Sequence, residues 1–343
     1  MGRNDNTLRL KTRVNLKLNT LFFSFVEKVI KLISRFTFRH ANMRVTYCCI
    51  NLVATVFKRH LVKYYSCASA LYLARCFFNY QGKDFCKLLI INKLMAEYIK
   101  FSLFNSNWIQ VKNFLDHNCS FSNPDSKPGK LLLFTHTGDY WLSILTMARQ
   151  YQGMGCEFIV PIYQPITDEI RKMYNRIKIP GVDVLFINIH DDGSLLKIIR
   201  CLKKPKSIVA IFYDLFCYST GIHNGAVDSV TFFNKKGYMT TGMLSLAEKM
   251  KLEINFISNR YSVSEGKYIT TISPAVLLSG QTDVDKVIIS HLESCIKENA
   301  YQWHFMISLD AYFHVPYSQL KLKNDRELAQ FARLNYKYIH LND

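Results

Sequence analysis

Short hydrophobic runs alternate with segments of helical periodicity between residues 130 and 273. The runs that we expect to form strands are Lys130–Thr135, Cys156–Pro161, Val182–Phe186, Ser207–Tyr213, Ile254–Asn259 and Tyr268–Ser273. The segments that we expect to form helices are Tyr140–Gln152, Asp168–Lys178, Gly193–Lys203 and Gly237–Lys251. Continuously apolar strands that alternate with helices are typical of a parallel sheet buried on both faces. The pattern therefore predicts an α/β fold with a mostly parallel central sheet flanked by helices.

The first 118 residues follow a different pattern, with long apolar stretches at helical spacing. No glycine occurs between Gly2 and Gly82, and no proline precedes Pro124. A cluster of turn-forming residues, CSFSNPDSKPGK, occupies residues 119–130. We therefore expect a helical N-terminal region over residues 1–118 and an α/β domain over residues 119–343.

The positive charge of the chain is concentrated in this helical region. The 343 residues include 44 Lys and Arg against 26 Asp and Glu, a formal net charge of +18, and residues 1–63 supply +11 of it (13 basic minus 2 acidic). Within them, Thr20–Phe36 has its hydrophobic side chains on one helical face and its basic ones toward the other. This is the pattern of a basic amphipathic helix, which can lie on an anionic membrane, and an ordinary surface helix packed on the core is the equal alternative.

Composition and charge also limit the class of protein. Hydrophobic residues make up 49% of the chain, which excludes a disordered protein, and the scarcity of glycine (14) excludes a collagen-like one. A nucleic-acid partner is not expected, because no helix-turn-helix, zinc-finger or RNP signature accompanies the charge. The expected partner is therefore an anionic membrane surface or an acidic protein.

The compartment is inferred from what the sequence does not contain. We find no signal peptide and no run of about 18–20 apolar residues that would span a bilayer. The best candidate, Val45–Phe57, has 13 residues and contains Asn51. The ten cysteines form no C-x-x-C pair and are interpreted as buried thiols. We expect a cytoplasmic protein, with peripheral attachment to the inner face of the membrane as an open alternative.

The candidate chemistry lies at the turn FTHTGDYWLS, which follows the first predicted strand of the α/β domain. Ligands of parallel sheets bind beyond the carboxyl ends of the strands, and His136 occupies such a position. A nearby carboxylate that holds one ring nitrogen of a histidine fixes its tautomer and raises its basicity. Asp139 is one candidate for that carboxylate, although it is also suited to capping the next helix.

Several segments after residue 130 resemble the lysophospholipid acyltransferase-like superfamily, in particular its bacterial lipid A (Kdo-lipid A) acyltransferase branch. LLLFTHTGDYWLS resembles the strand, histidine turn and helix of that family. The next units of the family resemble the segments IVPIYQPITDEIRKMYNRI and SLLKIIRCLKKPKSIVAIFYDL. The family's Phe-Phe-Gly segment and its arginine-bearing strand pair resemble FFNKKGYMTTGMLSLAEKMKLEINFISNRYSVSEGKYITTISP. LESCIKENAYQWHFMIS resembles the terminal helix with its tryptophan. The resemblance covers about the C-terminal half of the chain.

The resemblance implies an acyltransferase that moves an acyl chain from a CoA or acyl-carrier-protein thioester to a hydroxyl or amine. Such an enzyme would need no cofactor other than the thioester donor. In the family, a histidine acts as general base and an acid five residues later orients it. Here Trp141 occupies the position of that acid, and Gln164 stands where the family has an arginine. Asp139, or Asp214 at the end of another strand, would then replace the acid.

We accordingly assign His136 and Asp139 as the catalytic pair. The residues expected to bind substrate are Asp214, Arg260, Gln164, Tyr140 and Trp141. For some of these residues a structural role remains the alternative: Asp214 would stabilise a turn and Arg260 would pair with Glu265. A catalytically silent relative that binds a lipid or an acyl carrier as a scaffold is the alternative function.

Three other features receive structural interpretations. Trp303 is expected in the core, and Lys235 and Lys236 are expected in a solvated turn. His190 and the two aspartates after it are interpreted as a polar loop, so no metal site is predicted.

Overall fold

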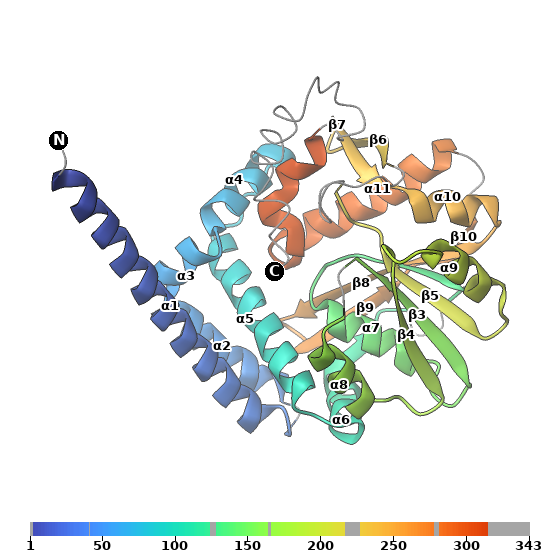
Figure 1. Ribbon diagram of the computed structural model, residues 1–343, viewed down its shortest axis with the longest axis horizontal. Helices are drawn as coiled ribbons and strands as arrows, with labels where there is room; N and C mark the ends of the chain where they lie inside the picture. The colour runs from blue at the N-terminus through green and yellow to red at the C-terminus, as the bar shows by residue number, and fades with distance from the viewer. Residues whose placement is uncertain are drawn as a thin grey trace.

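The structure is a computed structural model that describes residues 3–40, 42–123, 128–163, 166–216, 227–277 and 281–314. Side chains are described from residue 20 onward in the first helix and from residue 286 onward in the last long helix. Figure 1 shows a twisted sheet with helices on both faces, and a group of N-terminal helices beside it. The predicted α/β architecture, with a helical region before the sheet, is confirmed.

The central sheet is mostly parallel. Its strands are β1 (Cys119–Phe121), β2 (Leu131–Phe134), β3 (Cys156–Ile162), β4 (Val182–Asn188), β5 (Ser207–Phe212), β8 (Glu253–Ser262), β9 (Lys267–Ile272) and β10 (Val276–Leu277). Their order is β1-β9-β8-β2-β5-β3-β4, with β10 paired to β8. Only the β8–β9 and β8–β10 pairs are antiparallel. The four residues of β2 are fully buried, as expected for a central strand covered on both faces.

Helices cover the sheet and form the N-terminal region. The N-terminal helices are α1 (Arg3–Thr37), α2 (Met43–Val56), α3 (Lys58–Tyr64), α4 (Cys67–Phe78), α5 (Phe85–Phe104) and α6 (Trp108–Asn118). The helices of the α/β part are α7 (Tyr140–Arg149), α8 (Asp168–Arg176), α9 (Ser194–Lys203), α10 (Gly242–Lys249) and α11 (Gln281–Glu298), followed by the 3-10 helices η1 (Ala300–Gln302) and η2 (His304–Phe313).

Two segments differ from the sequence-based expectation. Residues 235–240 form a strand, β7 (Lys235–Thr240), which pairs with β6 (Val227–Phe232) in an antiparallel hairpin, so α10 begins at Gly242 and not at Gly237. Phe233 and Asn234 make the tight turn of this hairpin with positive φ. The expected turn cluster after residue 118 also begins with a strand, because β1 pairs with β9. Both strands are short, and β7 begins with two exposed lysines, so neither shows a clear period of two.

The N-terminal helices pack against one another and against the C-terminal segment. In Figure 1, α1, α2 and α5 lie side by side, and α4 lies next to η2. Helix α5 is the centre of this group, since ten of its residues are buried. None of the described helices is both long and apolar enough to cross a membrane.

Helix α1 divides its hydrophobic residues between the core and the surface. Val26 and Ile30 are buried, and Phe22, Val29 and Ile33 pack partly against the core. Four others remain exposed to solvent: Leu21, Phe25, Leu32 and Phe36. Packing on the core therefore accounts for only part of the amphipathic pattern.

Candidate functional site

The register of three neighbouring strands brings the candidate residues to one level. Phe134 of β2 is paired with Phe212 of β5 and with Ile257 of β8. His136, Asp214 and Asn259 therefore each lie two residues beyond the same rung of the sheet. Because the three strands are parallel, their carboxyl ends meet at one edge, where ligands of such sheets bind.

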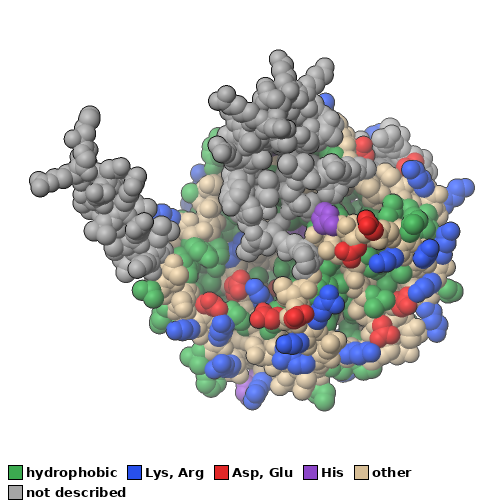
Figure 2. Space-filling view, viewed as in Figure 1, with side chains coloured by type: hydrophobic (Ala, Val, Ile, Leu, Met, Phe, Trp, Pro, Cys, Tyr) green, Lys and Arg blue, Asp and Glu red, His purple; other side chains and the backbone are tan. Residues whose placement is uncertain are grey.

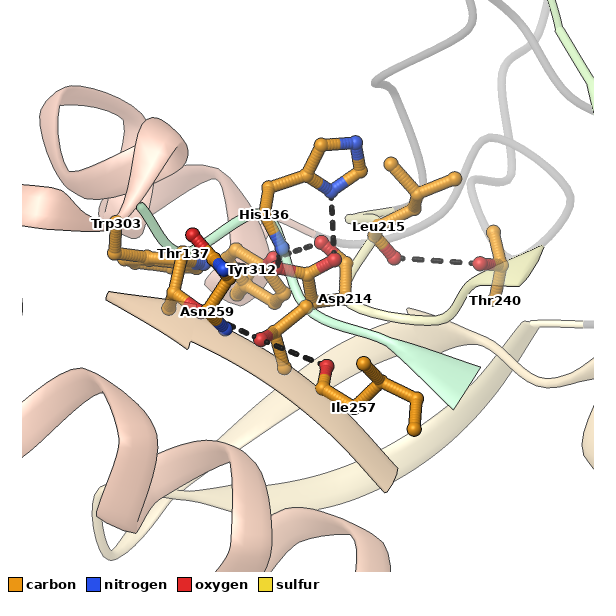
Figure 3. A network of polar contacts seen from close by, with 10 residues as sticks. His136, Thr137, Asp214, Leu215, Thr240, Ile257, Asn259, Trp303 and Tyr312 are labelled. Carbon is orange, nitrogen blue, oxygen red and sulfur yellow. Dashed lines mark hydrogen bonds and ion pairs between the residues drawn. The ribbon is translucent and has the colours of Figure 1, made fainter. Parts of the chain in front are cut away.

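At this edge, His136 binds Asp214 through both its ring and its backbone. The ring Nδ1 lies 2.7 Å from Oδ1 of Asp214, and the backbone N–H of His136 donates to Oδ2 at 2.8 Å. The indole Nε1–H of Trp303 donates to the same Oδ2 at 2.9 Å. The hydroxyl of Tyr312 donates to the backbone carbonyl of Asp214 at 2.7 Å. Figure 3 shows this network around the carboxylate.

These contacts fix both the position of the carboxylate and the tautomer of the histidine. Asp214 is fully buried, and hydrogen-bond donors from His136 and Trp303 point at both oxygens of its carboxylate. An ionised carboxylate only accepts hydrogen bonds, so Nδ1 of His136 carries a proton and Nε2 keeps a free electron pair. In Figure 3 this second ring nitrogen points away from Asp214, and the His136 side chain keeps 15% of its surface exposed. The pair has the arrangement of a general base and the group that orients it.

The turn after His136 is held rigidly against β8. Gly138 has φ +64°, and a Cβ at this position would lie 2.6 Å from the backbone oxygen of Asn259. The hydroxyl of Thr137 accepts the backbone N–H of Asn259 at 3.3 Å and is 2.8 Å from the hydroxyl of Thr135. The N–H of Gly138 donates to the carbonyl of Gln302 at 3.0 Å. Glycine is therefore required here, both by the left-handed backbone and by the close approach of β8.

Asp139, assigned from the sequence as the catalytic partner, does not contact His136. Its Oδ1 accepts the backbone N–H of Leu142 at 2.9 Å, so Asp139 is the N-cap of α7. The structural alternative for this residue is thus confirmed, and the carboxylate on His136 is Asp214. Burial raises the pKa of Asp139 to about 7, although hydrogen bonds from the backbone at Leu142 and Trp141 oppose the rise.

Aromatic rings line the space around the imidazole. Phe212 stacks on His136 with 4.0 Å between ring centroids, and Phe305 meets it edge-on at 4.8 Å. Tyr140 lies 5.9 Å away, and burial, followed by the charge of Asp139, raises the pKa of its hydroxyl to about 12. The surroundings of the imidazole are therefore largely aromatic.

Helix α5 of the N-terminal region carries a lysine, Lys93, whose charge acts on His304. Burial lowers the pKa of Lys93 on α5 to about 8. The positive charge of Lys93 and burial together lower the pKa of His304 well below its usual value, with a smaller contribution from His136. The rings of His304 and His136 are 6.2 Å apart, and the N–H of His304 donates to the carbonyl of His136 at 2.8 Å.

Sequence reasoning did not identify Lys93 or His304. A lysine in the mostly apolar run LLIINKLMAEYI was the available signal for Lys93. Trp303 was expected in the core and is fully buried, so that prediction is confirmed. Its hydrogen bond to Asp214 could not be inferred, because it depends on how the C-terminal segment folds over the sheet edge.

The remaining predicted residues lie outside the His136–Asp214 pair. The ring of Trp141 packs against Tyr140 and Tyr174, at 5.3 and 6.0 Å. Arg260 lies on β8, and within the described residues it forms no ion pair with Glu265, so the expected pairing is wrong. Arg260 and the His136–Asp214 pair share no hydrogen bond or ion pair either. Gln164 lies outside the described residues.

A comparison with models of known protein families finds no match to this chain, and a search of curated proteins finds none either. We therefore infer the function from the residues of the site and their geometry.

Proposed function

We propose that the protein is an acyltransferase in which His136 is the general base and Asp214 orients it. The observation that carries the proposal is the hydrogen bond between Nδ1 of His136 and the buried carboxylate of Asp214, with Nε2 left free beside aromatic rings. The expected acyl donor is a CoA or acyl-carrier-protein thioester, and the acceptor carries a hydroxyl or amine. The resemblance of the segments around His136 to the acyltransferase-like superfamily supports the same assignment.

The reaction follows from the free electron pair on Nε2. As the acceptor oxygen or nitrogen attacks the thioester carbonyl, its proton passes to Nε2, and the charge of Asp214 stabilises the imidazolium that forms. The tetrahedral intermediate then collapses, the carbon–sulfur bond breaks and the imidazolium returns the proton to the leaving thiolate.

Thioester turnover by four proteins tests this assignment. Release of free thiol is measured with a panel of long-chain acyl-CoA and acyl-carrier-protein donors, for the wild type, His136→Ala, Asp214→Asn and the matched control Asp139→Asn. We expect the first two variants to lose about 10³–10⁴-fold in rate, because each removes the base or reverses its tautomer. Asp139→Asn retains the helix cap and should stay within about tenfold of the wild type.

Two results would contradict the proposal. Equal rates for the wild type and His136→Ala would exclude His136 as the base. A loss in Asp139→Asn as large as in Asp214→Asn would return the orienting role to Asp139. Mass spectrometry of the incubated wild type distinguishes the silent alternative, since a scaffold would retain an acyl chain and never transfer it. Circular dichroism checks that Asp214→Asn is folded.

A further inference from the structure

A second feature of the molecule is a basic cavity away from the His136–Asp214 pair. It has a volume of about 530 Å³ and lies between α1, α5 and α6, with one residue of α8 at its rim. This size is typical of small-molecule sites. Its lining includes four cationic side chains, those of Lys31, Arg35, Arg39 and Lys100. The single carboxylate in the lining is that of Glu169. We call this cavity the α1–α5 pocket.

Three of these cations form no salt bridge with a carboxylate in the part of the chain that the structure describes. Lys31 pairs with Glu27 at 2.6 Å and lies over the ring of Phe101. Among the described residues, Arg35, Arg39 and Lys100 form no salt bridge. Uncompensated like charges around one cavity repel each other, and an anion placed between them removes that repulsion.

The floor of the α1–α5 pocket is polar and already ordered. The hydroxyls of Ser34 and Ser102 are 2.7 Å apart, and Ser106 donates to the carbonyl of Ser102 at 2.7 Å. The bond between Ser34 and Ser102 ties α1 to α5 at the pocket, and the bond from Ser106 holds the chain just after α5 against that helix. The helices that carry the basic side chains are therefore held together before any ligand binds, which lowers the cost of binding.

A stripe of exposed hydrophobic side chains runs along α1 next to the pocket. Leu21, Phe25, Leu32 and Phe36 are each more than half exposed. Their spacings of four, seven and four residues place them on one line of the helix, and Arg35 borders this line. Figure 2 shows hydrophobic and basic side chains next to each other over the described part of α1. An ordered row of this kind is a typical contact for a membrane or another apolar surface.

We propose that the α1–α5 pocket binds the phosphate of an anionic phospholipid headgroup, while the apolar stripe of α1 lies at the level of the acyl chains. The charge of the pocket selects an anion, and two arginines offer the paired N–H groups that phosphate oxygens accept. The adjacent stripe identifies the source of the phosphate as a lipid and not a free solute. This inference does not depend on the proposed acyl transfer.

The α1–α5 pocket lies on the same helix as Lys93, so a lipid bound in it would affect how the His136–Asp214 pair faces the membrane. Lys100 lies seven residues after Lys93 on α5, which corresponds to two turns on the same face and about 10 Å along the axis. A phosphate held at Lys100 would therefore fix the orientation of the His136 side of the molecule relative to the membrane surface.

Two triple variants of equal charge test the proposal. The pocket variant is Arg35→Gln, Arg39→Gln and Lys100→Gln. The control variant is Lys58→Gln, Arg59→Gln and Lys63→Gln, which removes three exposed charges from α3 outside the pocket. Sedimentation with vesicles of phosphatidylcholine, with and without phosphatidylglycerol, gives the affinities. We expect the pocket variant to bind the phosphatidylglycerol vesicles at least about tenfold more weakly than the control variant.

Three outcomes would overturn the proposal. Equal losses in the two variants would show that general charge, and not the pocket, determines binding. Titration calorimetry with sn-glycerol 3-phosphate tests the source of the phosphate: binding as tight as to vesicles would assign the pocket to a soluble ligand. Unchanged vesicle binding, together with loss of an acidic carrier protein in pull-downs, would assign it to a protein partner. Thermal melts verify that both variants, altered at exposed positions, are folded.

Discussion

Replacing Asp139 with asparagine tests, through protein stability, whether Asp139 is a buried helix cap with a role distinct from that of Asp214. Burial raises the pKa of Asp139 from 3.8 to about 7, so between these values the folded protein binds a proton that the unfolded chain releases. Because the native state then holds more protons, the free energy of unfolding falls as the pH rises through this window. The shift, 7 − 3.8, is about three units, and at about 1.36 kcal/mol per unit the cost of ionisation is about 4 kcal/mol above pH 7.

The variant Asp139→Asn removes this titration and keeps the helix cap. Asparagine is as favourable an N-cap as aspartate, so the bond from the Leu142 N–H remains. Between pH 5 and pH 8 the wild type should therefore lose about 2–3 kcal/mol more unfolding free energy than the variant. At pH 8 the variant should be the more stable protein.

Urea unfolding at the two pH values measures this difference. The midpoints are converted to free energies only if the wild type and variant have the same dependence on urea, since a changed slope would report a different unfolded or native state. Parallel pH profiles for the two proteins would refute the reasoning, because they would mean that Asp139 is ionised in both states.

Three further predictions concern the residues around the pair. Trp303→Phe removes one charged hydrogen bond from Asp214, so kcat/KM should fall about tenfold to hundredfold and its pH profile should shift; an unchanged profile would contradict a positioning role. Gly138→Ala should lower the free energy of unfolding by at least about 1–2 kcal/mol from its left-handed backbone alone, measured by urea unfolding, and an unchanged midpoint would contradict this. Lys93→Met removes the main cause of the low pKa of His304, so an NMR titration should show that pKa rising; no change would disprove the coupling.

The sequence was sufficient to predict the sheet and most of its helices. The apolar runs at β2, β3 and β5 are covered on both faces, so hydrophobicity alone marks them. The β6–β7 hairpin was not predicted, because its exposed lysines and alternating polar residues resemble a loop or a helix start. Its pairing depends on contacts with the distant C-terminal segment, such as β7 with η2.

The candidate site was predictable in part. The position of His136 followed from the strand end, and Asp214 was recognised as a strand-end carboxylate. The sequence favoured Asp139 as the partner because it is near in the chain, whereas the sheet register places Asp214 nearer in space. Register between β2 and β5 is not encoded by local periodicity, so no spacing rule would have chosen between the two carboxylates.

Because the carboxylate that contacts His136 comes from a different strand, the pairing of strands determines the geometry of the His136–Asp214 pair. In the H-x-x-x-x-[DE] pattern that the resemblance implies, the base and the acid lie only five residues apart, so the local geometry of one turn and the start of one helix sets their distance. Here the histidine follows β2 and the carboxylate follows β5, so the pairing of two parallel strands sets it. Position 141 is then released from this role, and Trp141 packs against Tyr174 on the outer side of the site. Asp214 depends instead on Trp303 and Tyr312, which makes the C-terminal segment a support of the pair.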